Sequence, residues 1–274
     1  MTRARVLTTG FLFVVATYML LPLWWLIVSS TKSGDDLYDG SLWFSHLSVG
    51  ANLDRVMSQD GGLYPRWLLN TAVYAGGGAL GATLLAAMAG YALAKYRFRG
   101  DRLVFGGIML AVLLPLPLLT IPIYLLESRI GLLNTVWGVL LPCMVSPFGV
   151  FLARAYATAA VPDELLDAGR VDGAGELRLF AVVGLRLMAP ALVTLFLFQF
   201  VAIWNNFFLP MMLLNDQELW PVTLGLVKWN SIRTGNLRDA VLMGALLSLI
   251  PMVLAFLSLQ RFWKADLAAG SVKA

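Results

Sequence analysis

The residues that could carry out chemistry are few and lie apart in the sequence. Cys143 is the only cysteine and lies in an apolar run, and His46 is the only histidine, with no cysteine or histidine beside it. A single thiol can form neither an intramolecular disulfide nor a thiolate metal cluster. We therefore expect no metal site, and the cysteine count indicates no particular redox compartment.

Catalytic groupings are also missing from the sequence. A membrane enzyme needs paired carboxylates or a nucleophile beside a base, and we identify no catalytic residues. The phosphate-binding pattern G-x-x-x-x-G-K-[ST] is absent, so we predict that this polypeptide does not bind and hydrolyse ATP by itself. A membrane-embedded enzyme acting on a lipid or isoprenoid remains a rival reading, and so does a passive channel.

One polar connection, residues 154–186, has the pattern of a helix, a turn and a second helix. Pro162 and Asp163 are typical of a helix start. Gly173 can adopt the left-handed backbone that ends a helix, and a second helix is expected to begin over Glu176 to Phe180. The pattern alone fits an amphipathic loop on the lipid headgroups equally well.

The elements that position these residues are long and apolar. Of the 274 residues, 59% are hydrophobic and 13% are charged, and the mean hydropathy is +0.77. A soluble domain carries about 25% charged residues. Since a helix needs about 20 apolar residues to cross a bilayer, we predict an all-α polytopic membrane protein with six transmembrane helices, in the uncharged runs Val6 to Thr31, Trp67 to Ala94, Leu103 to Leu126, Ile130 to Ala153, Leu187 to Asn215 and Ala240 to Gln260.

The third run contains three prolines, Pro115, Pro117 and Pro122. Proline lacks the backbone donor and clashes with the preceding turn, so we expect a kink in this helix. The predicted organisation is a first span with an external segment (1–66), a five-helix core that includes the 154–186 connection (67–263) and a tail (264–274).

The basic residues indicate how the six runs are oriented. With six spans, both termini share one side with the connections 95–102 and 154–186, and this side holds 13 of the 20 lysines and arginines. Short cytoplasmic loops carry the excess of basic residues, so we predict cytoplasmic N and C termini. The basic residues form no single patch, which argues against nucleic acid as a partner.

Residues 162–174, PDELLDAGRVDGA, resemble the EAA loop of binding-protein-dependent ABC importer permeases. The resemblance covers nearly the whole chain and is closest to the smaller permease subunit of maltose-type carbohydrate importers. It implies the type I ABC importer transmembrane fold, in a bacterial or archaeal cytoplasmic membrane. Other family-like segments are Leu21 to Trp24, Ser30 to Lys32, Trp67 to Thr71, Gly90 to Gly100, Gly131 to Thr135, Trp204 to Pro210 and Gln260 to Lys273.

The resemblance also implies the partners and the source of energy. The partners are a second permease subunit, two ATP-binding subunits and an extracytoplasmic solute-binding protein. ATP and Mg are bound by the partner subunits, and this chain holds no cofactor of its own. The implied cargo is a sugar or a related solute, and a polyamine, phosphate or peptide is the alternative for the same fold.

The EAA helix of such permeases docks in a groove of the ATP-binding subunit. Ala168 and Gly169 are expected to let a partner backbone approach closely. This sequence departs from the family pattern at Gly169, which replaces an alanine and lowers helix propensity, and at Arg186, where the family usually has proline before the next span. The coupling residues that the resemblance carries over are Glu164, Asp167, Ala168, Gly169, Asp172, Gly173 and Ala174.

Neutral hydrogen-bonding groups and aromatic faces suit a sugar. The candidates for a solute pathway are Asn70, Gln199, Trp204, Asn205 and Asn206. Hydrogen bonding between helices explains the same polar residues equally well.

Overall fold

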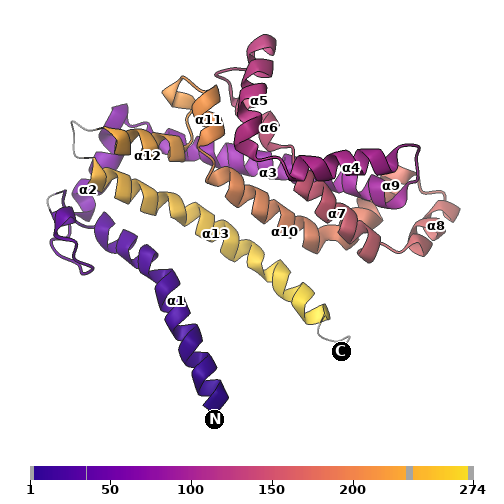
Figure 1. Cartoon of the computed structure of the whole chain (residues 1–274), viewed down its shortest axis with the longest axis horizontal. Helices are drawn as coiled ribbons and strands as arrows, with labels where there is room; N and C mark the ends of the chain where they lie inside the picture. The colour runs from indigo at the N-terminus through magenta and orange to yellow at the C-terminus, as the bar shows by residue number, and fades with distance from the viewer. Residues whose placement is uncertain (1–2, 35, 233–236, 271–274) are drawn as a thin grey trace. The chain divides into compact units, whose positions relative to one another are not determined.

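The computed structural model describes residues 3–34, 36–232 and 237–270, and this part of the chain contains helices and no strand (Figure 1). Residues 271–274 of the predicted tail lie outside it. The α-helices are α1 (Arg3–Ser30), α2 (Val49–Ser58), α3 (Tyr64–Lys95), α4 (Asp101–Val112), α5 (Leu116–Ile130), α6 (Val136–Cys143), α7 (Pro147–Ala160), α8 (Asp163–Val171), α9 (Glu176–Leu179), α10 (Leu185–Trp204), α11 (Phe208–Leu213), α12 (Val222–Ser231) and α13 (Arg238–Gly270).

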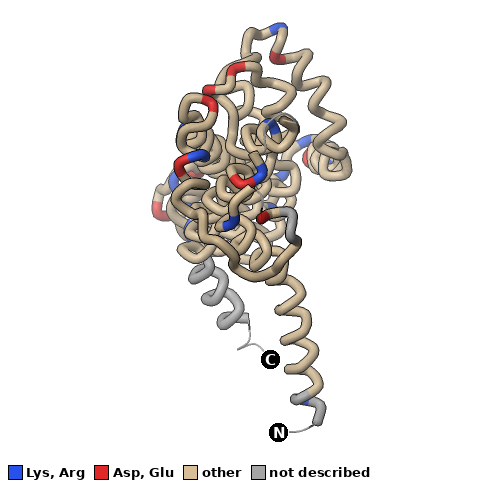
Figure 2. Tube along the Cα trace, turned by 90° about the vertical axis from the view of Figure 1, so that its left-hand side faces the viewer, with Lys and Arg blue, Asp and Glu red and all other residues tan. Residues whose placement is uncertain are grey.

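Five stretches of helix in the described chain are long and apolar enough to cross a membrane, and a bent pair raises the number to six. Figure 2 shows that α1, the helix that leads from the end marked N, carries no acidic or basic residue along most of its length. The five stretches are Leu7–Ser30, Tyr64–Lys95, Val136–Ala160, Glu176–Trp204 and Arg238–Leu259. The predicted all-α polytopic fold is confirmed.

The third predicted span is the bent pair, α4 followed by α5. The two helices meet at an angle of 107°, and Pro115 is the residue that precedes α5, with an extended backbone. The expected proline kink is thus present, but it is a full break between two helices. A proline disfavours helical backbone in the residue before it, and here two prolines, Pro115 and Pro117, follow each other closely.

The fourth and fifth spans differ from their predicted bounds. The fourth begins at Val136 and runs to Ala160, because the hydroxyl of Thr135 accepts a hydrogen bond from Gly138 N (3.1 Å) and caps α6. The fifth begins at Glu176 and ends at Trp204. Its predicted end at Asn215 is wrong because the chain leaves the helix after Trp204 and α11 forms a separate short helix.

The chain forms two compact units, and the smaller comprises Met1–Pro65 and Gly225–Pro251. Its parts are held by polar contacts between distant residues. Tyr64 donates a hydrogen bond to Gly244 O (2.6 Å), and Arg55 forms an ion pair with the buried Asp239. Asn52 is buried and donates to the carbonyls of Ser30 and Lys32, which fixes the chain just after α1.

The larger unit, Arg66–Leu224 with Met252–Ala274, contains the helices that position the candidate site. In one apolar cluster, Ala75 and Ala79 of α3 pack with Phe200 and Trp204 of α10. A second cluster joins α3, α7 and α10 to the 154–186 connection, and its buried members are Tyr91, Ala153, Ala157, Val161, Leu166, Leu179 and Met188. This second cluster is the base on which the connection rests.

Candidate functional site

Helix α8 is the first element of the site, and it is amphipathic. Pro162 precedes it in an extended conformation, and Asp163 and Glu164 lie in its first turn, where the helix dipole favours negative charge. Leu166 is 1% exposed and points into the apolar cluster. Glu164 and Ala168 are exposed on other faces of the helix. The helix therefore has one side bound to its own chain and another open to a partner.

A tight turn at Gly173 ends α8. Its φ is +79°, the left-handed region that favours glycine. Gly173 N donates to Arg170 O (3.0 Å), and Ala174 N donates to Gly169 O (2.9 Å). This pair of bonds is the Schellman motif, which satisfies carbonyls at a helix end. The predicted left-handed Gly173 is confirmed.

Gly169 has a different environment from the one expected. A side-chain carbon on Gly169 would lie 2.5 Å from Leu179 Cδ2, so the space left by the missing side chain is filled by Leu179 of α9. Leu179 is 2% exposed and belongs to the same cluster as Leu166. The close approach at Gly169 is therefore within the chain, because the turn folds α9 back onto α8.

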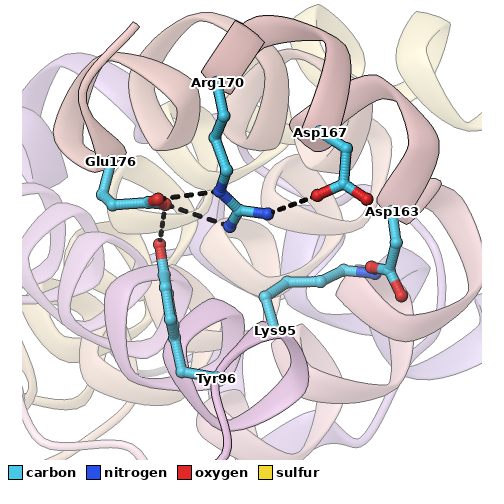
Figure 3. A network of polar contacts seen from close by, with 6 residues as sticks. All are labelled: Lys95, Tyr96, Asp163, Asp167, Arg170 and Glu176. Carbon is cyan, nitrogen blue, oxygen red and sulfur yellow. Dashed lines mark hydrogen bonds and ion pairs between the residues drawn. The ribbon is translucent and has the colours of Figure 1, made fainter. Parts of the chain in front are cut away.

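A network of charged and polar side chains covers this turn (Figure 3). Arg170 binds Asp167 Oδ1 (2.7 Å) through Nη1 and binds both carboxylate oxygens of Glu176 (2.8 and 3.3 Å). Tyr96, just after α3, donates its hydroxyl proton to Glu176 Oε2 (2.6 Å). Burial and the bond to Glu176 raise the pKa of Tyr96 to about 12. The phenol therefore keeps its proton at neutral pH and remains a donor.

Lys95 makes a second link between α3 and the connection. Its ammonium donates to Val161 O (2.5 Å) and to Asp163 Oδ1 (2.7 Å). The hydrogen bond and charge of Lys95 hold the pKa of Asp163 below its usual range, so this carboxylate is ionised at neutral pH.

The helix after the turn is part of one continuous apolar stretch, Glu176–Trp204, that is long enough to cross a membrane. Phe180–Gly184 forms a π-helical segment between α9 and α10, and Tyr91 packs on it, with its ring centroid 5.1 Å from that of Phe180. Arg186, the position at which the family resemblance implies a proline, lies within the first turn of α10.

A separate cavity of about 350 Å³ lies among α5, α6, α10 and α11. Three neutral polar side chains line it, those of Thr120, Gln199 and Asn206, and no charged residue does. Gln199 Nε2 donates to Ser146 Oγ (2.5 Å), just before α7. The remaining lining residues are Leu116, Pro117, Ile123, Pro142, Cys143, Val145, Ala202, Ile203, Phe208 and Leu209.

The family described as binding-protein-dependent transport system inner membrane component matches residues 82–264, which include the whole 154–186 connection and the cavity. This chain belongs to that family. It is therefore a permease component of a transport system and a multi-pass membrane protein.

Similar proteins of known role cover the full length of this permease. It is 31% identical to the arabinooligosaccharides transport system permease protein AraQ of Bacillus subtilis (strain 168), over 98% of this chain and 96% of that protein. It is 24% identical to the diacetylchitobiose uptake system permease protein NgcG of Streptomyces coelicolor, over 99% of this chain and 90% of the relative.

A solved structure shares the fold of the permease. It is a chain of a bacterial ABC transporter involved in the import of the acidic polysaccharide alginate, with a TM-score of 0.83 and 24% identity. The match covers 95% of this chain and 98% of that chain.

The structure separates the predicted solute residues of this permease into two groups. Gln199 and Asn206 line the cavity. Asn70 instead donates to the carbonyls of Glu218 and Trp220 (2.7 and 3.0 Å). Trp204 is buried in the α3–α10 cluster, and Asn205 is exposed and donates to Val201 O of its own helix. These last three side chains do not line the cavity.

Several residues of the site were not predicted. The contacts of Lys95 and Tyr96 span 66 to 80 residues of sequence, and no local pattern indicates such pairs. Thr120 and Ser146 were missed as well, although Ser146 before Pro147 is a recognisable helix cap, since its hydroxyl accepts from Gly149 N. The i,i+3 pair of Asp167 and Arg170 could have been inferred from helical spacing.

Proposed function

We propose that this chain is one of two permease subunits in an ATP-driven importer for a sugar or a related solute. The other components are a second permease, two ATP-binding subunits and an extracytoplasmic solute-binding protein. ATP and Mg are bound by the ATP-binding subunits, and hydrolysis there drives the spans between states open to either side of the membrane.

The observation that carries this proposal is the two-sided character of α8. One face is fixed to the membrane helices through the buried Leu166, and another presents Glu164 and Ala168 to the surroundings. An amphipathic helix fixed in this way can pass a displacement from a docked partner to the helices that it rests on. The chain has no phosphate-binding loop of its own, so the energy has to come from a partner.

Crosslinking in the assembled complex tests the docking. In a Cys143→Ala background, Ala168→Cys should form a crosslink with a cysteine placed in the ATP-binding subunit. Asp54→Cys, an exposed position on α2, is the control, because it falls in the segment predicted to be external. Crosslinking at 54 with none at 168 or neighbouring positions would overturn the proposal.

A neutral, hydroxyl-rich cargo fits the cavity best. Its polar groups are two amides and a hydroxyl, and no charged side chain lines it, so a polyamine or phosphate would leave its own charge unpaired there. The relatives named for arabinooligosaccharides and diacetylchitobiose also favour a sugar. Uptake by the reconstituted complex should be seen with labelled neutral oligosaccharides; uptake of spermidine, phosphate or a peptide alone would refute this cargo.

The orientation of the chain follows from the basic residues, with both termini and α8 on the cytoplasmic side. A reporter enzyme that is active only in the cytoplasm should be active when it is fused after Ala274, and a reporter that is active only outside the cytoplasm should be inactive there. An externally active reporter would overturn the topology and the docking together.

A further inference from the structure

Besides its short link to α7 and the packing of Leu166 in the apolar cluster, α8 has two further connections to the membrane helices. The covalent one runs through the Gly173 turn and α9 to α10. The other is made of side chains, and it joins the connection to the end of α3 at Lys95 and Tyr96.

Lys95 and Tyr96 bind the first residues of the two short helices α8 and α9. Lys95, the last residue of α3, binds Asp163, the first residue of α8. Tyr96 binds Glu176, the first residue of α9. Both helices of the turn are therefore attached at their starts to one point on α3.

The contact of Lys95 joins the end of one helix to the start of another. A cation at the start of a helix opposes the helix dipole, whereas a cation at the end of a helix complements it. Lys95 lies at the end of α3 and at the start of α8. Its side chain is only 5% exposed although it ends on an exposed carboxylate, that of Asp163. The arrangement suits a bond whose purpose is to join two helices.

The covalent route to α10 contains a segment with irregular helical geometry. Phe180–Gly184 is π-helical, a conformation that is rare, occurs mostly as short bulges and is frequent at functional sites. A push on α9 along this route passes through the π-helical segment before it reaches α10. The side-chain route has no such segment, because Lys95 and Tyr96 are at or next to the end of α3.

We infer that Lys95 and Tyr96 form a clamp that passes the displacement of the coupling helix α8 to α3 in parallel with the covalent route to α10. This inference rests on the proposed docking of α8 to an ATP-binding subunit. Lys95 and Tyr96 are positioning residues, which touch neither nucleotide nor solute. Loss of the clamp should let ATP hydrolysis continue while less of it is converted into transport.

The test uses the complete complex in proteoliposomes and measures solute transported per ATP hydrolysed. Lys95→Met combined with Tyr96→Phe should lower this ratio about tenfold, because the side-chain bonds that join the end of α3 to Val161, Asp163 and Glu176 are lost. Lys95→Arg should restore most of the loss from Lys95→Met. Arg99→Met, an exposed basic residue four positions on, is the control and should keep the wild-type ratio.

Crosslinking at Ala168→Cys in the same variants separates the two hypotheses. A crosslink that persists with a lowered ratio supports the clamp. A crosslink that persists with an unchanged ratio overturns the clamp and leaves the docking intact. If Ala168→Cys forms no crosslink in a protein that retains Lys95 and Tyr96, the docking itself is overturned. If the double variant does not assemble, Asp163→Asn replaces it, because its side chain is 76% exposed; an unchanged ratio there also contradicts the clamp.

Discussion

Two polar segments of the larger unit are held in opposite ways. In the 161–176 turn, charged side chains bind one another, as Arg170 binds Asp167 and Glu176. In the 213–222 segment, neutral side chains of α3 bind backbone carbonyls: Trp67 donates to Gln217 O (2.7 Å) and Tyr74 to Leu219 O (2.8 Å). The second arrangement fixes the path of the chain whatever side chains the segment carries. The first depends on the identity and charge of each partner.

The difference fits two mechanical roles. Bonds between exposed charges are each weak and are screened by salt, so the turn can adjust when a partner docks. Asn134 Oδ1 accepts from Asn215 N and Asp216 N (2.9 and 2.8 Å), and Thr71 Oγ1 accepts from Val222 N (2.8 Å). With the donors from α3, these bonds hold the 213–222 segment at many points, which makes it a rigid frame.

The largest effect is expected from Gly173→Asp. The φ of +79° at this position strains any side chain, and the change adds a third carboxylate beside those of Asp172 and Glu176. Transport should fall to near background while the protein still inserts and ATP hydrolysis by the complex continues. Parallel ATPase and uptake assays check this, and wild-type coupling in the variant would contradict the role of the turn.

A smaller effect is expected from Asn70→Leu, which acts on the rigid frame. The Trp220 carbonyl loses its side-chain donor, and the Glu218 carbonyl keeps only the longer bond from Arg66 Nε (3.4 Å). An unsatisfied buried group costs about 1–3 kcal/mol. Hydrogen exchange at the amides of Leu219, Trp220 and Val222 should become faster, by an amount that reflects about 1–3 kcal/mol.

Asn205→Leu is the control for Asn70→Leu, because Asn205 is exposed and bonds only within its own helix turn and to a thioether. Its effect on the same amides should be negligible. Equal exchange in the two variants would mean that Asn70 does not hold the frame.

The smallest effect is a dependence on pH that only the turn should show. Because Lys95 lowers the pKa of Asp163 in the folded protein, the stabilisation from this contact is present above the ordinary pKa of an aspartate and is lost as the pH falls through the lowered value. The protection of α8 amides from hydrogen exchange, corrected for the intrinsic effect of pH on exchange, should fall under acidic conditions. The protection of the amides of Leu219, Trp220 and Val222 should not change in parallel. A parallel change in both segments would remove the contrast between them.

Local chemistry made some of these features predictable. The uncharged runs predict the spans because backbone groups in lipid must be paired within a helix, and Gly173 was predictable because few residues other than glycine adopt a positive φ. The prolines predicted a bend but not its angle of 107°, which depends on what the freed backbone groups meet. The amide of Asn70 suits a sugar and suits a bond within the protein equally well. The structure shows the second, and the sequence does not distinguish them because the partner residues lie about 150 positions away.

The same limit applies to the coupling turn. The start of α8 after Pro162 and its end at Gly173 are predictable from the sequence, since both depend on residues within a few positions. Two other features depend on how distant parts of the chain meet. Leu179 fills the space at Gly169, and Lys95 and Tyr96 bind residues of the turn. The residues that make the turn were therefore predictable, whereas the residues that attach it were not.

The central claim is that energy enters this permease from outside the chain, through α8. The most direct measurement is accumulation of a labelled sugar, against its gradient, in proteoliposomes that contain both permeases and the solute-binding protein, with and without the ATP-binding subunits. We predict uphill accumulation only when the ATP-binding subunits and ATP are present. Uphill accumulation without them would contradict the account.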